Sequence, residues 1–162
     1  MINRITIISL FIIFTAVVLI TTSKTFADTR EEAAKNIIWE KEKAIYNARP
    51  KTGLDYYIEN ASPNYKGWPP GTSQPSSLAK LKKNQRLITI PNSEVLKMYF
   101  DDFTLHDNTG VIYYHTHRTR LPNGKKVDQH YHIAHVWIKD KDGDWKILGA
   151  MGRLENNNTS SP

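Results

Sequence analysis

The sequence predicts an α+β domain in which N-terminal helices pack on one face of a curved antiparallel sheet. The first observation is helical spacing of apolar side chains in the segment that follows the N-terminal apolar run. The second is a change after Glu94 to aromatic and β-branched runs, separated by short turns. Helices followed by hairpins are typical of the α+β class. A sheet that curves around its helices forms a cone with a pocket inside.

Residues 1–27 are expected to be a signal peptide and not part of the domain. Arg4 precedes a run of apolar residues from Ile5 to Ile20, and Thr25-Phe26-Ala27 ends on the small residues that a signal peptidase requires. The run is slightly shorter than the roughly 20 residues of a membrane-spanning helix. We therefore expect cleavage after Ala27 and a periplasmic or secreted protein. The alternative is an uncleaved N-terminal membrane anchor.

Composition limits the remaining possibilities. The 162 residues contain no cysteine, which excludes disulfides, thiolate catalysis and thiolate metal sites. The net charge of +6 falls to +4 without residues 1–27, and the basic residues are mixed with acidic ones. This mild balance predicts no nucleic-acid partner. No second apolar run follows, so we expect no membrane contact after cleavage. Residues 28–154 then form one domain, and the polar residues 155–162 form a disordered tail.

Three helices are predicted in the first half of the domain. They cover Asp28–Ala48, ended by Pro50, then Gly53–Asn60, and Ser77–Arg86. The intervening stretch is rich in Pro, Gly and Ser and is predicted to be a long loop with a short strand around Tyr65.

Four strands are predicted in the second half. Their turns contain Asp107–Gly110, Pro122–Gly124 and Asp142-Gly143, which makes them consecutive antiparallel hairpins. The expected strands are Val95–Leu105, Val111–Arg120, Lys126–Ile138 and Asp144–Arg153.

Two stretches carry a resemblance to a known superfamily. The last hairpin has Val136-Trp137, an Asp142-Gly143 turn and Trp145, and it resembles nuclear transport factor 2-like proteins and the association domain of calcium/calmodulin-dependent protein kinase II. The stretch Tyr65–Gly71 (YKGWPPG) resembles SnoaL-like, uncharacterised exported members. The resemblance implies a cystatin-like cone that often dimerises through its open sheet face. The superfamily includes isomerases, cyclases, dehydratases and plain binding modules, so the fold alone does not fix an activity.

Five of the six histidines lie between Tyr113 and His135, and their arrangement depends on the turn Pro122-Asn123-Gly124. A two-residue turn would place His115 opposite His132 and His117 opposite His130. These four imidazoles would then share one face and form a possible zinc or copper site.

The alternative, a three-residue loop with Gly124 in the left-handed region, is favoured. A two-residue turn requires an N–H from the residue that Pro122 occupies, and proline has none. In this register His115 faces Tyr131 and shares a face with His135, whereas His130 and His132 point to the other face. We therefore expect no metal and no cofactor.

The favoured register predicts a pocket wall made of aromatic side chains, several of which end in a polar nitrogen or oxygen atom. The expected ligand-binding residues are Tyr113, His115, Tyr131, His135 and Trp137. Asp101 and Asp102 lie on the preceding strand, and one of them is expected to face the pocket. There it is either the partner of a neighbouring Arg or Lys or a general base. The candidate catalytic residues are therefore His115, His135, Asp101 and Asp102.

Three functional interpretations remain open. The first is a pocket that binds a small, partly apolar ligand without established chemistry. The second is an enzyme that catalyses proton transfer, isomerisation or dehydration through His115 or His135 with an Asp. The third is an interaction module that forms a homodimer through the open sheet face.

Overall fold

The structure is a computed structural model that describes residues 4–155, with side chains from Asp28 onward. The chain divides into two compact units, residues 1–34 and 35–162, and the fold described below is that of the second unit. The predicted signal peptide lies outside the part whose side chains are described, and the predicted tail lies outside the described residues except for Glu155. Within the described side chains, none of the helices is both long and apolar enough to span a membrane.

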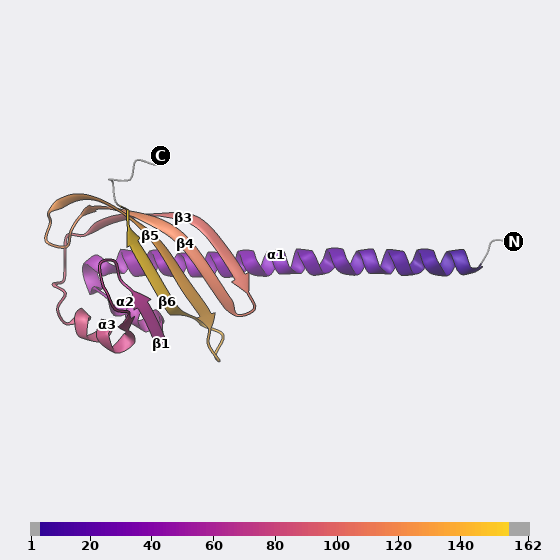
Figure 1. Ribbon diagram of the computed structural model, residues 1–162, viewed down its shortest axis with the longest axis horizontal. Helices are drawn as coiled ribbons and strands as arrows, with labels where there is room; N and C mark the ends of the chain where they lie inside the picture. Colours follow the sequence, from indigo (N-terminus) through magenta and orange to yellow (C-terminus); the bar gives the residue numbers. More distant parts are fainter. Residues whose placement is uncertain (1–3, 156–162) are drawn as a thin grey trace. The chain divides into compact units, whose positions relative to one another are not determined.

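The elements follow the predicted order of helices first and strands after them (Figure 1). They are α1 (Arg4–Thr52), α2 (Asp55–Asn60), β1 (Ala61–Trp68), β2 (Ser76–Ser77), α3 (Leu78–Gln85), β3 (Val95–His106), β4 (Thr109–Arg120), β5 (Lys126–Lys139) and β6 (Trp145–Leu154).

The helix ends have local causes. Pro50 was expected to end the first helix, but it lies inside the last turn of α1, and the chain leaves the helix at Gly53, whose φ is +64°. A residue without Cβ adopts this left-handed conformation at little cost, and Gly53 donates its N–H to the Arg49 carbonyl at 3.0 Å. The α3 helix begins where the Ser77 side chain accepts a hydrogen bond from the Lys80 N–H.

The six strands form one mixed, mostly antiparallel sheet in the order β2-β1-β6-β5-β4-β3. β1 is longer than expected and pairs with β6 in parallel, whereas β3 to β6 form consecutive antiparallel hairpins. The end of α1 packs on the inner face of the sheet. Ile38 and Ile45 of α1 are fully buried, as are Ile112, Trp137 and Ile147 of the sheet. Burying each such side chain contributes about 1.5–3 kcal/mol, so this layer holds the helix on the sheet.

The β4–β5 hairpin has the predicted loop but not the predicted register. Gly124 is left-handed (φ +85°), and the Leu121 N–H bonds to the Lys125 carbonyl, which leaves Pro122-Asn123-Gly124 as a three-residue loop. Beyond Arg120↔Lys126 the pairing shifts, because Val127 and Asp128 both lie opposite Thr119. This bulge adds one residue to β5. His115 therefore pairs with His132, and His117 with His130.

Candidate functional site

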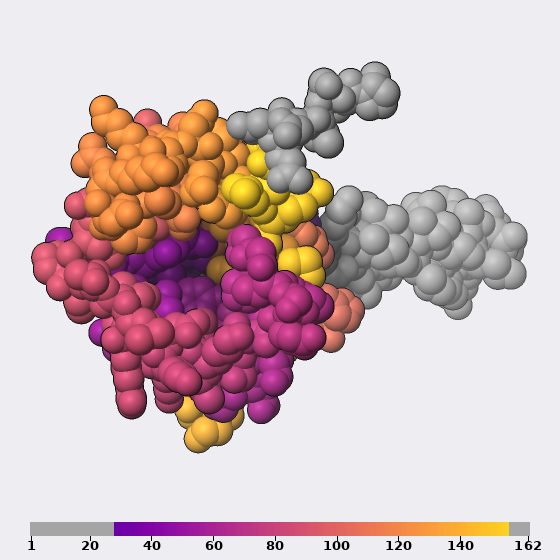
Figure 2. All heavy atoms as spheres, turned by 60° about the vertical axis from the view of Figure 1, so that its left-hand side comes forward, coloured from indigo at the N-terminus to yellow at the C-terminus, as the bar shows by residue number. Residues whose placement is uncertain are grey.

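The inner face of the sheet and the helices enclose a cavity of about 340 Å³. Its walls are mainly aromatic and aliphatic, with a few polar side chains. The residues that line it include Tyr46, Tyr57, Tyr65, Trp68, Thr116, Arg118, Tyr131, Ile133 and His135. Figure 2 shows the recess, with α1 residues (violet) at its floor and the β4–β5 hairpin (orange) beside it. An apolar cavity with a few directed polar groups is the usual form of a small-ligand site.

His135 is the histidine that reaches this cavity, and a buried carboxylate holds it. Its Nδ1 lies 2.6 Å from Oε1 of Glu42 on α1, which also accepts the Trp137 Nε1–H at 2.8 Å. The Tyr114 hydroxyl donates to Oε2 of Glu42 at 2.9 Å. Glu42 is completely buried, and His135 is 4% exposed.

This arrangement assigns the proton on the imidazole. An ionised carboxylate only accepts hydrogen bonds, so Nδ1 of His135 carries the proton that it shares with Glu42. The second ring nitrogen, Nε2, makes no hydrogen bond within the described part of the chain, and in a neutral imidazole it has a free lone pair. A neutral imidazole oriented by a carboxylate is the usual arrangement of a general base.

Tyrosines around this pair remain protonated. Burial raises the pKa of Tyr114 well above its ordinary value, and the nearby Glu42 carboxylate raises it further. Burial also raises the pKa of Tyr57 well above its ordinary value, and the Tyr57 ring stands edge-on to His135. Tyr46, whose pKa burial also raises, lies 3.3 Å from Tyr114 through their hydroxyl oxygens. These hydroxyls therefore act as hydrogen-bonding groups at neutral pH.

An ion-pair network supplies positive charge to the cavity. Glu94 pairs with Arg49 at 3.2 Å and with Arg118 at 3.0 Å, so two guanidinium groups share one carboxylate. Among the described residues, neither Nε of Arg118 nor Oγ1 of Thr116 has a hydrogen-bond partner, and both atoms are buried. An unpaired buried polar atom costs about 1–3 kcal/mol.

The predicted pocket residues separate onto two faces. Tyr131 and His135 line the cavity, and Trp137 is buried on the same face, where it bonds to Glu42. The expectation that Tyr113 and His115 share this face is wrong, because the bulge in β5 moves them to the outer face of the sheet. His135 and His115 therefore point in opposite directions.

Neither predicted aspartate reaches the cavity. The register of β3 against β4 shifts between Phe100 and Asp102, so that Asp101 is an extra residue and both carboxylates are exposed. Asp101 pairs with His115 on the outer face at 2.7 Å, and Asp102 accepts the Phe103 N–H. The carboxylate of the site is Glu42 instead. A sequence signal was present, because Glu42 falls at helical spacing between Ile38 and Ile45 on the buried stripe.

The outer face carries a second group of polar side chains, His115, His117, Asp128, His130 and His132. Asp128 accepts from His117 at 2.6 Å and lies 3.3 Å from His130. The bond with His117 keeps the pKa of the Asp128 carboxyl below its ordinary value. The expectation that His115 shares a face with His135, apart from His130 and His132, is thereby corrected. The four histidines share one face.

Solved structures with the same fold support this architecture. A candidate ketosteroid isomerase from Parabacteroides distasonis is 14% identical with a TM-score of 0.61, covering 75% of this chain and 88% of that one. A candidate dehydratase of the NTF2-like family from Streptomyces avermitilis is 15% identical (TM-score 0.61, 77% and 98%). The CaMKII hub of S. rosetta is 18% identical (TM-score 0.58, 73% and 94%).

At these identities the likeness shows the fold, which is the nuclear transport factor 2-like cone. No family model matches the sequence. No curated protein matches it either. The predicted fold class, an α+β cone with the nuclear transport factor 2-like fold, is confirmed.

Proposed function

We propose that this nuclear transport factor 2-like cone binds a small ligand with an apolar body and an acidic or carbonyl group. The observation that carries the proposal is that two residues lining the cavity, Arg118 and Thr116, each hold a buried polar atom, Nε and Oγ1, that has no hydrogen-bond partner within the described part of the chain. Both can donate a hydrogen bond, and both project from the inner face of β4. The aromatic walls suit the apolar body, and the excess of guanidinium over carboxylate in the Arg49–Glu94–Arg118 network favours an anionic group.

A set of aryl carboxylates, each paired with its neutral amide, tests this function by calorimetric titration. The carboxylates should bind more tightly than their amides. Thr116→Val keeps the size of the side chain but removes the hydroxyl, and Arg118→Lys keeps the charge but removes Nε. Each should weaken carboxylate binding at least tenfold, about 1.4 kcal/mol. The control Thr104→Val changes an exposed threonine on β3 and should have no effect. Equal binding by wild type and both pocket variants would contradict the proposal.

A second function, proton transfer, is favoured by the Glu42–His135 pair. Nε2 of His135 would remove a proton from the carbon next to a ligand carbonyl, and the electron pair of that C–H bond would pass to the oxygen as an enolate. Arg118 and Thr116 would stabilise the enolate oxygen. Glu42 would stabilise the imidazolium and keep the ring oriented.

Exchange of solvent deuterium into the α-carbon of small cyclic ketones, followed by NMR, tests this chemistry without knowledge of the natural substrate. Wild-type protein should catalyse the exchange, and His135→Gln should lower its rate by about 100-fold or more. The matched control is His115→Gln on the outer face, which should retain the wild-type rate. Exchange that is unchanged in His135→Gln would exclude this role.

We also propose that the domain acts outside the cytoplasm. The support is the sequence pattern of residues 1–27, with Arg4 before an apolar run and Ala27 at its end. N-terminal sequencing of the native protein should begin at Asp28. An intact Met1 would identify residues 1–27 as a retained anchor.

A homodimer through the outer sheet face is proposed as well. Tyr99 of the edge strand β3 and Tyr113 of the neighbouring β4 lie on this face and are 43% and 42% exposed, which is high for large aromatic side chains. Sedimentation velocity at several concentrations should show a dimer that Tyr113→Asp converts to a monomer. A wild-type protein that remains monomeric throughout would refute this assembly.

A further inference from the structure

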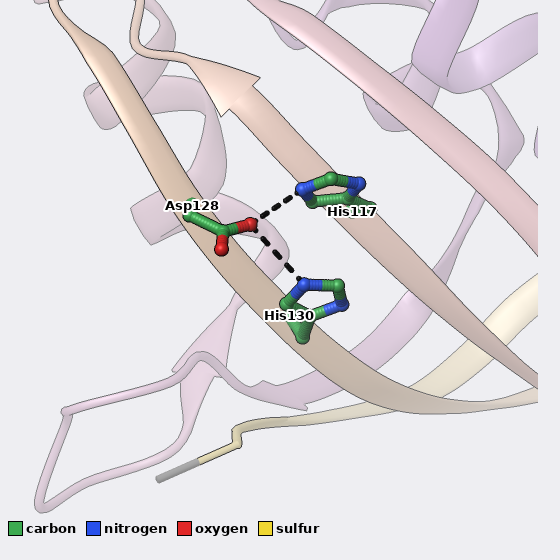
Figure 3. Close-up of side chains that lie close together, drawn as sticks. All are labelled: His117, Asp128 and His130. Atoms are coloured by element: carbon green, nitrogen blue, oxygen red, sulfur yellow. Dashed lines mark hydrogen bonds and ion pairs between the residues drawn. The ribbon is translucent and has the colours of Figure 1, made fainter. Parts of the chain in front are cut away.

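Three ligating side chains meet on the outer face of the sheet, opposite the cavity. His117 projects from β4, and Asp128 and His130 project from β5 (Figure 3). One ligand atom from each lies within 4.8 Å of the other two. Figure 3 shows both imidazole rings directing a nitrogen toward the same carboxylate oxygen.

The strand register creates this cluster. Residues at steps of two share a face, so the spacing His-x-His places His115 and His117 together on β4, and His130 and His132 together on β5. The pairing His117↔His130 then stacks two imidazoles, with ring centroids 4.3 Å apart and planes 11° apart. The bulge formed by Val127 and Asp128 brings the Asp128 carboxylate to the same point.

We propose that His117, Asp128 and His130 form a binding site for a divalent transition-metal ion of the zinc and copper class. Two imidazole nitrogens and one carboxylate oxygen are a donor set that these ions prefer, and they leave a fourth position for water or another ligand. Calcium and magnesium prefer sites made of oxygen alone, so this set discriminates against them.

The distances are close to those that a metal requires. Ligand bonds of about 2.0–2.1 Å in a tetrahedral site place the ligand atoms roughly 3.4 Å from one another. Nε2 of His130 lies 3.3 Å from Oδ1 of Asp128, whereas Nε2 of His117 is closer, at 2.6 Å. For these two pairs the adjustment needed is therefore below about 1 Å, and the ligand nitrogens of His117 and His130 lie within 4.8 Å of each other. Asp128, 73% exposed, is free to make it.

A single cation can bond to all three side chains of the cluster. Both imidazoles direct a nitrogen toward one carboxylate oxygen, Oδ1 of Asp128, and the two rings stack face to face. One divalent ion accepts a lone pair from each neutral ring and bonds to the carboxylate at the same time. The three side chains then complete one site.

The test is calorimetric titration of the full chain, without an affinity tag, with Zn²⁺. We expect one site per chain. His117→Ala, Asp128→Asn and His130→Ala should each weaken Zn²⁺ binding at least tenfold. The control His106→Ala removes an exposed histidine away from the cluster and should leave the affinity unchanged. The double variant His115→Ala/His132→Ala removes the neighbouring pair on the same face and should leave it within threefold.

NMR of the wild-type chain gives a second readout that does not depend on whether a variant folds. Zn²⁺ should shift the imidazole signals of His117 and His130, and it should leave those of His106 and His135 unchanged. Absence of a Zn²⁺ site would overturn the proposal. A site that survives all three single variants, or one lost only in the His115/His132 double variant, would overturn it as well.

Discussion

At the scale of single residues, Glu42 determines the chemistry of the cavity. Its carboxylate is completely buried, a position that charged groups occupy only when they are paired and hydrogen-bonded. The donors of Tyr114, His135 and Trp137 meet this requirement. The bond between Glu42 and Nδ1 of His135 also orients the imidazole, so stability and reactivity at this site depend on one side chain.

Replacing Glu42 by Gln should lower the free energy of unfolding by about 1–3 kcal/mol. The amide is nearly isosteric with the carboxylate, but one of the two accepting oxygens is replaced by an NH₂ group, which is a donor. This NH₂ group faces another donor, so buried polar atoms are left unpaired. Urea unfolding at neutral pH measures the change. Glu40→Gln is the matched control on the same helix, because the Glu40 side chain is 71% exposed, and it should change stability by less than about 0.5 kcal/mol. Equal stabilities of the two variants would show that Glu42 is not the centre of this network.

At the scale of elements, the sequence predicted the type and order of the helices and strands well, because apolar periodicity and turn residues are local signals. It also predicted the three-residue loop with Gly124 left-handed. The bulge opposite Thr119 was not predicted, since no turn residue marks it. An error of one residue in register exchanges the faces of a whole strand. That is why His115, predicted to lie beside His135 on the cavity wall, lies on the outer face, while the prediction for His135 holds.

The loop itself provides a prediction at this scale. Gly124→Ala should destabilise the domain by about 1–2 kcal/mol, because an L side chain is strained at φ +85°. The space around the added Cβ is open, with Ser93 at 4.0 Å, so the cost is conformational and not steric. Gly124→Asn is the matched comparison, since asparagine tolerates this region, and it should cost less. Thermal unfolding measures both. If Gly124→Asn destabilised the domain as much as Gly124→Ala, the left-handed conformation at this position would not be the cause of the lost stability.

At the scale of the whole domain, one sheet separates two sets of polar groups. The inner face holds the aromatic cavity with Arg118 and with His135, which bonds to Glu42 of α1, and the outer face holds the histidine cluster with Asp128. The period of two along β4 and β5 makes this separation, because adjacent residues project to opposite sides. Substitutions in one set should therefore leave the other intact, which is the basis of the matched controls proposed above.

Stability at high pH depends on the inner set. Burial raises the pKa of Tyr57 and Tyr114 well above the ordinary value, and it raises that of Tyr46 and Tyr65 as well. In the unfolded chain these phenols lose their protons near pH 10, whereas the folded domain keeps them. The unfolded state thus binds fewer protons, so the free energy of unfolding is fully retained below about pH 10 and falls as the pH rises further.

Tyr57→Phe should reduce this alkaline loss. It removes one proton from the difference between the two states, so the slope of unfolding free energy against pH above about pH 10 should become shallower by up to about 1.4 kcal/mol per pH unit. Near neutral pH the variant should lose only the hydrogen bond from the Tyr57 hydroxyl to that of Tyr65, about 1 kcal/mol. Urea unfolding at several pH values between 7 and about 11 separates the two effects. Parallel curves for wild type and variant would mean that Tyr57 ionises in the folded domain as readily as in the unfolded chain.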